Sequence, residues 1–459
     1  MTPAAPAATD TGRTGGPAHG ARKPMALPAW PVAGILALYP LWWALGLGVL
    51  VFAVMAVPML FLLLRRRAAG RPLRLPPGFL WWALFLIAVV VSLGALGVDP
   101  PGTIAEHATG RLPGASYKLI MYVALTVLLL YAGNLTEAEL PRRRLVNYLG
   151  WLFVVTVAGG LLGMVAGHFQ FTSPVEMLLP AGVRGKGFVQ SLVHPYAAQI
   201  MDLVGGDKPR PAAPWGYTNT WGNNFCLLAG WLVVAAGQSR RRSARFWAIV
   251  CLLVSIVPAV VSLNRGLWIG LGLLVGYVAC RYVLAGKMWI IGLLAVVTAL
   301  LGMALMVTPL GGVVDARLDN GKSNGVRSFL VDRAMDGIGG SPIVGYGGTR
   351  NTAGGRQSIA VGETSSCERC GNFTVGGNGQ LWQLLYAHGV VGTVGYLGFF
   401  TYALWRFRRD RSAIGVAGSA ALVTSFSAMF WYNSLVTPLA FMVLAVALLW
   451  RNSIEGDPT

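Results

Sequence analysis

Arg265 is the residue whose position in this sequence most strongly suggests chemistry. It lies in Ser262-Leu-Asn-Arg-Gly266, a short segment that separates two long apolar stretches, and neither stretch contains Asp or Glu. A guanidinium at the boundary of a membrane is costly unless it is paired. Because its planar fork can donate parallel hydrogen bonds to phosphate oxygens, the position predicts an anionic ligand. The alternative is an arginine that snorkels to headgroups or backbone carbonyls.

Two long polar stretches, about 168–218 and 310–380, carry the other candidates. Arg184 lies in the first, and Arg327 in the second begins a stretch with helical apolar spacing. A solvated or ion-paired role is the alternative for each. His194, in Val-His-Pro-Tyr, is the candidate base for proton transfer at neutral pH. His388 falls inside an apolar stretch, which favours a buried structural role.

The cysteines divide into two groups. Cys226, Cys251 and Cys280 lie in apolar stretches and are expected to be core residues. Cys367 and Cys370 form a CxxC in the second polar stretch, where a local disulfide is the preferred interpretation and a redox-active pair the alternative. Too few ligands stand nearby for zinc, and there is no phosphate-binding glycine motif, so we expect no metal and no other cofactor.

The composition places these residues in an integral membrane protein. Hydrophobic residues make up 55% of the 459 residues and charged residues only 12%. Since about 20 apolar residues cross a bilayer, the sequence predicts an all-α polytopic protein with about twelve spans. The predicted spans are 27–41, 43–64, 78–97, 117–134, 145–167, 219–237, 246–262, 264–284, 288–309, 381–404, 413–430 and 434–450. The first two form one apolar block, which we divide at Tyr39-Pro40.

Arginine clusters occupy nearly every second gap between these spans, for example Arg65–Arg67, Arg142–Arg144 and Arg240–Arg242. Cytoplasmic loops are enriched in Lys and Arg, so the net charge of +19 indicates membrane orientation rather than nucleic-acid binding. Both polar stretches then lie outside, the larger one between spans 9 and 10. The high proportion of arginine, alanine and glycine suggests a bacterial cytoplasmic membrane.

The expected organisation is one transmembrane domain, 27–451, between two cytoplasmic tails. Residues 1–26 are rich in Pro, Ala, Gly and Thr, which predicts disorder. The second tail is 452–459. In the second polar stretch we expect a helix from about Ser323 that ends at Gly339-Gly-Ser-Pro342.

Several motifs together resemble those of the O-antigen ligase and O-antigen polymerase superfamily. Ser262-Leu-Asn-Arg-Gly266 is similar to its Ser-Arg-Gly turn, and Ser341-Pro-Ile-Val-Gly-Tyr-Gly347 to its Pro-x-x-Gly-x-Gly turn. Gln380–Gly392 is similar to the span that follows the family's large loop. The match covers roughly 246–404. One position departs from the family, because Asn378 replaces a histidine regarded as the base.

The resemblance implies a metal-independent, inverting glycosyltransferase of the cell envelope. Such an enzyme moves a glycan from a polyprenyl-pyrophosphate carrier to a glycan or lipid acceptor outside the membrane. It implies that Arg265, with Arg327 and Arg184, holds the pyrophosphate, and it supplies no base, which leaves His194 as the candidate. A transporter or flippase of lipid-linked saccharides is the alternative function, and a non-catalytic assembly factor is a third.

Overall fold

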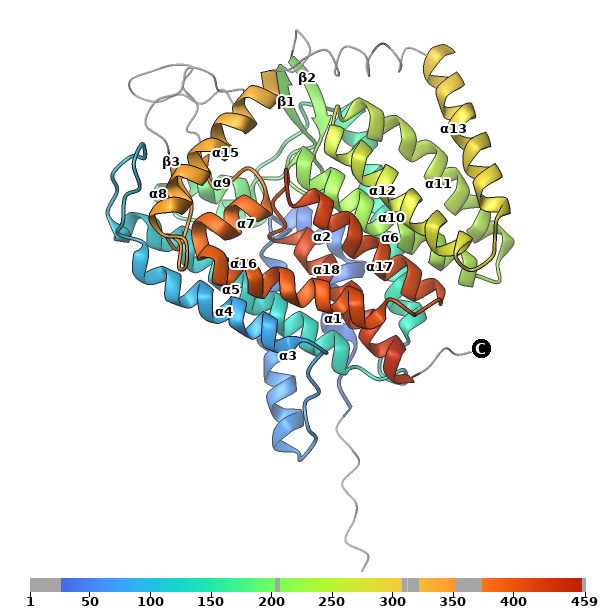
Figure 1. The fold of residues 1–459 in the computed structure, drawn as a ribbon, viewed down its shortest axis with the longest axis horizontal. Coiled ribbons are helices and arrows are strands. Elements are labelled where there is room, and N and C mark those ends of the chain that lie inside the picture. Colours follow the sequence, from blue (N-terminus) through green and yellow to red (C-terminus); the bar gives the residue numbers. More distant parts are fainter. Residues whose placement is uncertain (1–25, 203–206, 308–311, 313–321, 352–373, 456–459) are drawn as a thin grey trace, which may run out of the picture.

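The structure is a computed structural model that describes residues 26–202, 207–307, 312, 322–351 and 374–455, and most of these residues are helical (Figure 1). The helices are α1 (Trp30–Ala37), α2 (Tyr39–Leu45), α3 (Val51–Ala68), α4 (Phe79–Ser92), the 3-10 helix η1 (Leu93–Ala95), α5 (Ala108–Asn134), α6 (Arg142–Val165), α7 (Pro174–Leu178), α8 (Ala181–Arg184), α9 (Gly187–Val193), α10 (Thr218–Gln238), α11 (Arg242–Val261), α12 (Arg265–Val283), α13 (Trp289–Val307), α15 (Lys322–Gly340), α16 (Gln380–Phe407), α17 (Ala413–Ala428) and α18 (Thr437–Glu455). The strands are β1 (Ala198–Asp202), β2 (Asp207–Pro211), β3 (Arg350–Asn351) and β4 (Thr374–Val375).

Six helices are long and apolar enough to cross a membrane: α5, α6, α11, α12, α16 and α18. Shorter apolar helices lie at Phe79–Ala95, Trp289–Leu300 and Ala413–Ala428. The described residues therefore confirm a mostly helical chain with membrane-spanning helices, whereas the count of twelve spans stays a prediction. α11 exposes large apolar side chains such as Trp247 and Leu253, the pattern expected of a lipid-facing surface.

The core is built around α18. Side chains from Leu439 to Trp450 are all buried, and α18 packs against α5, α10 and α17. A helix that is apolar on every side must be covered by others, and the run LAFMVLAVALLW has no polar face to offer water. Around this core, α10 packs along α6 and α16 packs along α4.

The first apolar block folds differently from our expectation. Its helices are interrupted at Leu38, one residue before the predicted break, but the chain does not reverse there. α2 ends at Gly46, whose left-handed φ of 82° stops the helix, and α3 begins at Val51 and packs back against α1. The reversal at 46–50 needs the glycine backbone, because a side chain at Gly46 would collide with Ser173 and the Val193 carbonyl.

The predicted arginine clusters lie at helix ends that gather at one end of the bundle, among them the end of α3 and the start of α6 (Figure 1). We call it the tail end and define it by Arg66, Arg142, Asp410 and Arg451. Arg66 Nη1 donates to the Asn134 carbonyl at 2.8 Å. Arg142 Nη1 donates to Asn452 Oδ1 at 2.6 Å, and Asn452 Nδ2 donates to Asp410 Oδ2 at 2.8 Å. The grouping that the sequence predicted is confirmed, while the side of the membrane stays a prediction.

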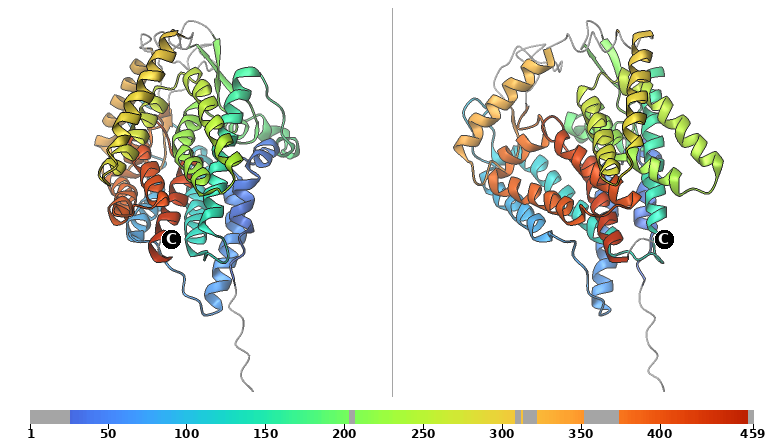
Figure 2. Two further views of the ribbon diagram at one scale, coloured as in Figure 1. Left: turned by 90° about the vertical axis from the view of Figure 1, so that its right-hand side faces the viewer. Right: turned by 45° about the vertical axis from the view of Figure 1, so that its right-hand side comes forward.

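The opposite end, the loop end, holds α15, β1, β2 and the turn Ser262–Asn264 (Figure 2). β1 and β2 form an antiparallel hairpin with Ala198 opposite Pro211, and β3 pairs with β4. These two short hairpins are small additions to the mostly helical architecture that the sequence predicted. α15 runs from Lys322 to Gly340, which confirms the predicted loop helix and its glycine end.

Two helices extend beyond the limits of the predicted segments. α5 begins at Ala108, well before the predicted 117, since Pro113 is accommodated in its first turns. The second tail was predicted to start at 452, but α18 continues to Glu455, because Arg451 and Asn452 bond to neighbouring elements at the tail end.

α16 is kinked at Gly389, whose φ of 63° interrupts the helical hydrogen bonds. The turn after α15 uses the backbone groups that the kink releases. Tyr346 N donates to the Tyr386 carbonyl at 3.0 Å, Gly347 N donates to the Ala387 carbonyl at 2.8 Å, and Val390 N donates to the Pro342 carbonyl at 2.8 Å. A Cβ at Gly389 would collide with the Ile343 carbonyl, so the joint depends on glycine.

Candidate functional site: an arginine cluster beside a histidine–glutamate pair

The turn Ser262–Asn264 places Arg265 at the first residue of α12. Leu263 has a left-handed φ of 55°, which reverses the chain within a few residues. Asn264 then caps α12, with its Oδ1 accepting from Leu267 N at 3.3 Å. Arg265 therefore lies at the positive end of a 19-residue helix, a position that attracts anions.

Three other segments hold this turn. Asn264 Nδ2 donates to the Thr218 carbonyl at 3.2 Å, and the Tyr432 hydroxyl donates to Asn264 Oδ1. Arg210 Nε donates to the Ser262 carbonyl at 2.7 Å. The turn is thus fixed by β2, by the first turn of α10 and by the segment before α18.

Gly266 makes the close approach of this last segment possible. A Cβ at position 266 would collide with the Tyr432 hydroxyl and with Trp431 Nε1. The glycine of the Ser-Leu-Asn-Arg-Gly motif therefore has a packing role next to Arg265.

Arg327, on α15, is brought to the same place from the other polar stretch. Burial lowers the pKa of its guanidinium, and the positive charge of Arg265 lowers it further, whereas Tyr432 acts in the opposite direction. The two charges are thus close enough to repel each other. Within the described part of the chain, no hydrogen bond or ion pair engages Arg327, although Arg333 on the same helix lies near Asp336.

Nitrogen donors without a partner lie in the segments around this cluster. Among the described residues, Trp431 Nε1 and Asn378 Nδ2 are both buried and make no hydrogen bond. Asn433 Nδ2 donates to the Gly377 carbonyl and Gln380 N to the Tyr432 carbonyl, so the two segments run side by side. Asn433 Oδ1, an acceptor in the same segments, is also buried without a partner among the described residues, so this region contains polar atoms of both kinds whose hydrogen bonds are not made.

A large apolar groove of about 1000 Å³ leads away from this end along α12. Its lining on α12 runs from Trp268 to Tyr282, a length of about 21 Å at 1.5 Å per residue. Arg265 is one helical turn before Trp268, hence on the same side of the helix. α10 and α17 contribute small residues such as Gly230 and Ala417 to the groove.

His194 lies beside a cavity at the same end and is paired with a carboxylate. Its Nδ1 is 2.8 Å from Glu176 Oε2, and the Glu176 side chain is only 5% exposed. Since a carboxylate accepts, Nδ1 carries the proton and Nε2 remains as an acceptor. Ser173 fixes the carboxylate's segment, because its hydroxyl caps α7 and accepts from Glu176 N at 3.1 Å.

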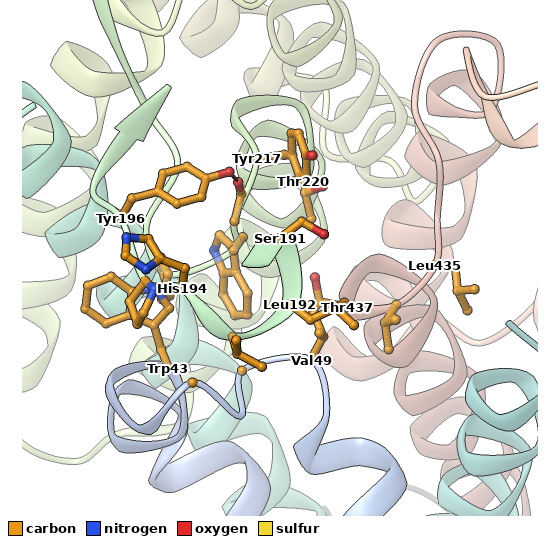
Figure 3. A pocket seen from close by; sticks show the side chains of 18 of the residues that line it. Trp43, Val49, Ser191, Leu192, His194, Tyr196, Tyr217, Thr220, Leu435 and Thr437 are labelled. Atoms are coloured by element: carbon orange, nitrogen blue, oxygen red, sulfur yellow. Dashed lines mark hydrogen bonds between the residues drawn. The ribbon is translucent and has the colours of Figure 1, made fainter. Parts of the chain in front are cut away.

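This cavity has a volume of about 150 Å³ and joins five parts of the chain (Figure 3). It is lined by residues of the α2–α3 turn, α5, the α9–β1 segment, the residues before α10 and the start of α18. In the view of Figure 3, His194 and Trp43 lie at one end and Leu435 at the other.

The other predicted site residues have different outcomes. Arg184 ends α8 and is exposed, and no bond of the described residues joins it to Arg265 or Arg327. His388 is buried against Ser92, with 2.9 Å between its Nδ1 and the serine Oγ, as a structural role requires. Cys367 and Cys370 lie outside the described residues, so their disulfide stays a prediction.

Sequence reasoning missed Glu176, Asn264 and Tyr432. Glu176 has a detectable signal, because Ser173-Pro-Val-Glu176 has the form of a helix start with an acidic residue in the first turn. Neither Asn264 nor Tyr432 has such a signal, since their roles depend on the packing of distant segments.

Comparison with known proteins gives no relative from which a function could be taken: no protein-family model and no curated protein matches this chain. The case for a function therefore depends on the geometry above.

Proposed function

We propose that the protein is a membrane glycosyltransferase that moves a glycan from a polyprenyl-pyrophosphate carrier to an acceptor hydroxyl. The observation that carries this proposal is the convergence of Arg265 and Arg327. Two guanidinium groups repel each other unless an anion lies between them, and no described carboxylate acts on Arg327. A pyrophosphate has the negative charge and the acceptor oxygens that two neighbouring guanidinium groups bind well.

The apolar groove supports a lipid-linked substrate over a soluble nucleotide. It begins one turn below Arg265 and follows α12 for about 21 Å through the apolar part of the helix. An apolar chain gains free energy when it is buried there, whereas a ribose or a base would lose its hydrogen bonds to water. A pyrophosphate headgroup at Arg265 would bind the arginine cluster, and its isoprenoid chain would fill the apolar groove.

The proposed step is a single displacement at the anomeric carbon. The acceptor hydroxyl oxygen attacks this carbon, and the bond from the carbon to the pyrophosphate oxygen breaks. The polyprenyl pyrophosphate leaves with the bonding electron pair, stabilised by Arg265 and Arg327, and the configuration at the carbon is inverted. The hydroxyl proton passes to His194 Nε2, while Glu176 holds Nδ1 and stabilises the imidazolium.

Donor binding tests the arginine cluster without knowledge of the glycan. The full-length protein in nanodiscs would be titrated with undecaprenyl pyrophosphate and, separately, with undecaprenol. We expect the pyrophosphate to bind more tightly and Arg327→Ala to weaken its binding about ten- to a hundred-fold, the effect of losing a charge-assisted hydrogen bond of about 1.5–3 kcal/mol. Arg265→Lys, which keeps the charge but loses the fork, should also weaken binding.

Arg333→Ala is the matched control, because Arg333 lies on the same helix but is exposed and near Asp336. Equal binding of both lipids, or equal losses in the 327 and 333 variants, would contradict the pyrophosphate site. A protein that moved the donor across a bilayer and left its glycan attached would instead be a transporter.

A further inference from the structure

The cavity beside His194 differs from the arginine cluster in its chemistry. None of its lining residues is Lys, Arg, Asp or Glu. Its walls carry aromatic rings, among them Trp43, Trp215 and Tyr217, and its polar groups include His194 and several hydroxyls, for example that of Thr220. A charged headgroup would find no counter-charge here, and an alkyl chain would leave the hydroxyls unmatched.

The aromatic walls are rigid. Trp215 is buried, with its ring 4.5 Å from Tyr39 and 5.5 Å from Phe441, and its Nε1 donates to Thr156 Oγ1 at 3.1 Å. Trp43 packs edge-on against Phe171 at 6.0 Å. Fixed rings lose little side-chain freedom when a ligand packs on them, so this wall is prepared for binding.

The size of the cavity matches one six-membered ring. Its volume is about 150 Å³, and an apolar cavity of about this size is known to hold benzene. A pyranose also has a six-membered ring, with apolar C–H faces for the aromatic walls and hydroxyls for the threonines, and the groups that make it bulkier than benzene would extend through the open side of the cavity. The exposed residues Ser191 and Tyr217 leave the cavity accessible to the remainder of a longer chain.

Two segments line both this cavity and the arginine cluster. Thr220 lines the cavity, and two residues before it the Thr218 carbonyl accepts from Asn264, the neighbour of Arg265. Likewise Leu435–Thr437 line the cavity, while Tyr432 bonds to Asn264. A ring in the cavity would therefore lie beside His194, and these two segments connect the cavity to the turn that carries Arg265.

We propose that this cavity is a binding site for one neutral pyranose ring, the ring that carries the acceptor hydroxyl. This inference depends on the proposed function for the word acceptor, but the saccharide site itself does not. It assigns Trp43 as the stacking surface and Thr220 as a hydrogen-bonding group, and it places the attacking hydroxyl at His194 Nε2.

Saturation-transfer NMR with a panel of methyl hexopyranosides on the full-length protein tests the site. We expect at least one glycoside to receive saturation at its ring protons, and Trp43→Ala to weaken its binding about ten-fold or more. Trp43→Phe, which keeps a ring, should retain most of the binding. Trp247→Ala is the control, since Trp247 is 65% exposed on α11 and does not line the cavity.

Further variants separate folding and catalysis from binding. Thr220→Val removes one hydroxyl at nearly constant shape and should weaken glycoside binding, and undecaprenyl pyrophosphate affinity reports that each variant is folded. His194→Gln should still bind glycoside but lose transfer. Binding that is unaffected by both Trp43→Ala and Thr220→Val, or displacement of the glycoside by dodecanol, would overturn the saccharide site while leaving the arginine cluster intact. If undecaprenyl pyrophosphate bound no more tightly than undecaprenol while the glycoside still bound, the proposed function would be overturned and the saccharide site would remain.

Discussion

The arginines at the two ends of the molecule differ in their hydrogen bonds and ion pairs. At the tail end, Arg142 Nε lies 2.6 Å from Glu137 Oε1 and its Nη1 bonds to Asn452, while Arg451 bonds to Glu137 and to the Leu140 carbonyl. At the loop end, Arg327 has no hydrogen bond or ion pair to any residue of the described ranges, and the positive charge of Arg265 acts on it.

This difference separates arginines that bond within the protein from arginines that are candidates for binding a ligand. Arg350, also at the loop end, is buried but donates to backbone carbonyls of Ala95–Val98 and Tyr346–Thr349, so it holds two segments together. Burial alone therefore does not mark a ligand site. The mark is a half-buried guanidinium whose donors have no partner among the residues that the structure describes.

The comparison predicts first that the two ends face opposite sides of a membrane. In a chain whose natural cysteines are replaced, a single cysteine at Thr374 should react with an impermeant maleimide in intact cells. A cysteine at Ser239, near the tail end, should react only after lysis. Equal labelling of both positions in intact cells would remove the basis for an outer site.

Replacing an arginine at the tail end should lower the free energy of unfolding, whereas replacing Arg327 at the loop end should not. Arg142→Ala removes the donor to Asn452 Oδ1 and one of the two arginines that contact Glu137, so we expect a loss of roughly 2 kcal/mol in unfolding free energy. Arg327→Ala should leave stability unchanged or raise it, because it removes repulsion with Arg265. Thermal unfolding of the detergent-solubilised variants measures both, and a larger loss for Arg327→Ala would assign that residue a structural role.

The smallest of these effects should come from the carboxylate beside His194. Glu176→Gln keeps a hydrogen-bond acceptor for Nδ1 but cannot stabilise an imidazolium, so glycan transfer should slow about ten-fold with undecaprenyl pyrophosphate binding unchanged. Single-turnover transfer and donor titration separate the two. Glu139→Gln, which alters a carboxylate at the tail end, serves as the control; a rate that falls equally in both variants would argue against a special role for Glu176.

Helix positions and the gathering of basic residues could be predicted from sequence, because hydropathy and the distribution of arginine act locally. The site was predictable only in part. Arg265 and Arg327 stand out because each is a charge beside apolar sequence, and the structure brings them together. Arg184 was chosen by the same reasoning, yet its exposed place on α8 depends on how the α7–α9 segment packs, which no local pattern specifies.

The reversal at Gly46 and the β1–β2 hairpin show the other limit. The continuous apolar block from 27 to 64 is compatible with a turn at several points, and contact with Ser173 and Val193, far along the chain, decides which is used. In the same way, His194 and Glu176 meet because α7 and α9 fold back on each other. Such pairings depend on tertiary packing, and they cannot be inferred from the composition of the sequence.

The opening of α16 at Gly389 imposes an order on biogenesis. A newly inserted 380–407 segment, alone in lipid, satisfies its backbone only as an unbroken helix, because free carbonyls at Tyr386 and Ala387 cost several kcal/mol each. The bent form becomes stable only when the 342–347 turn supplies the N–H groups of Tyr346 and Gly347. Docking of this turn and bending of the helix that it contacts are therefore one event, and a chain whose turn has not docked keeps a straight helix.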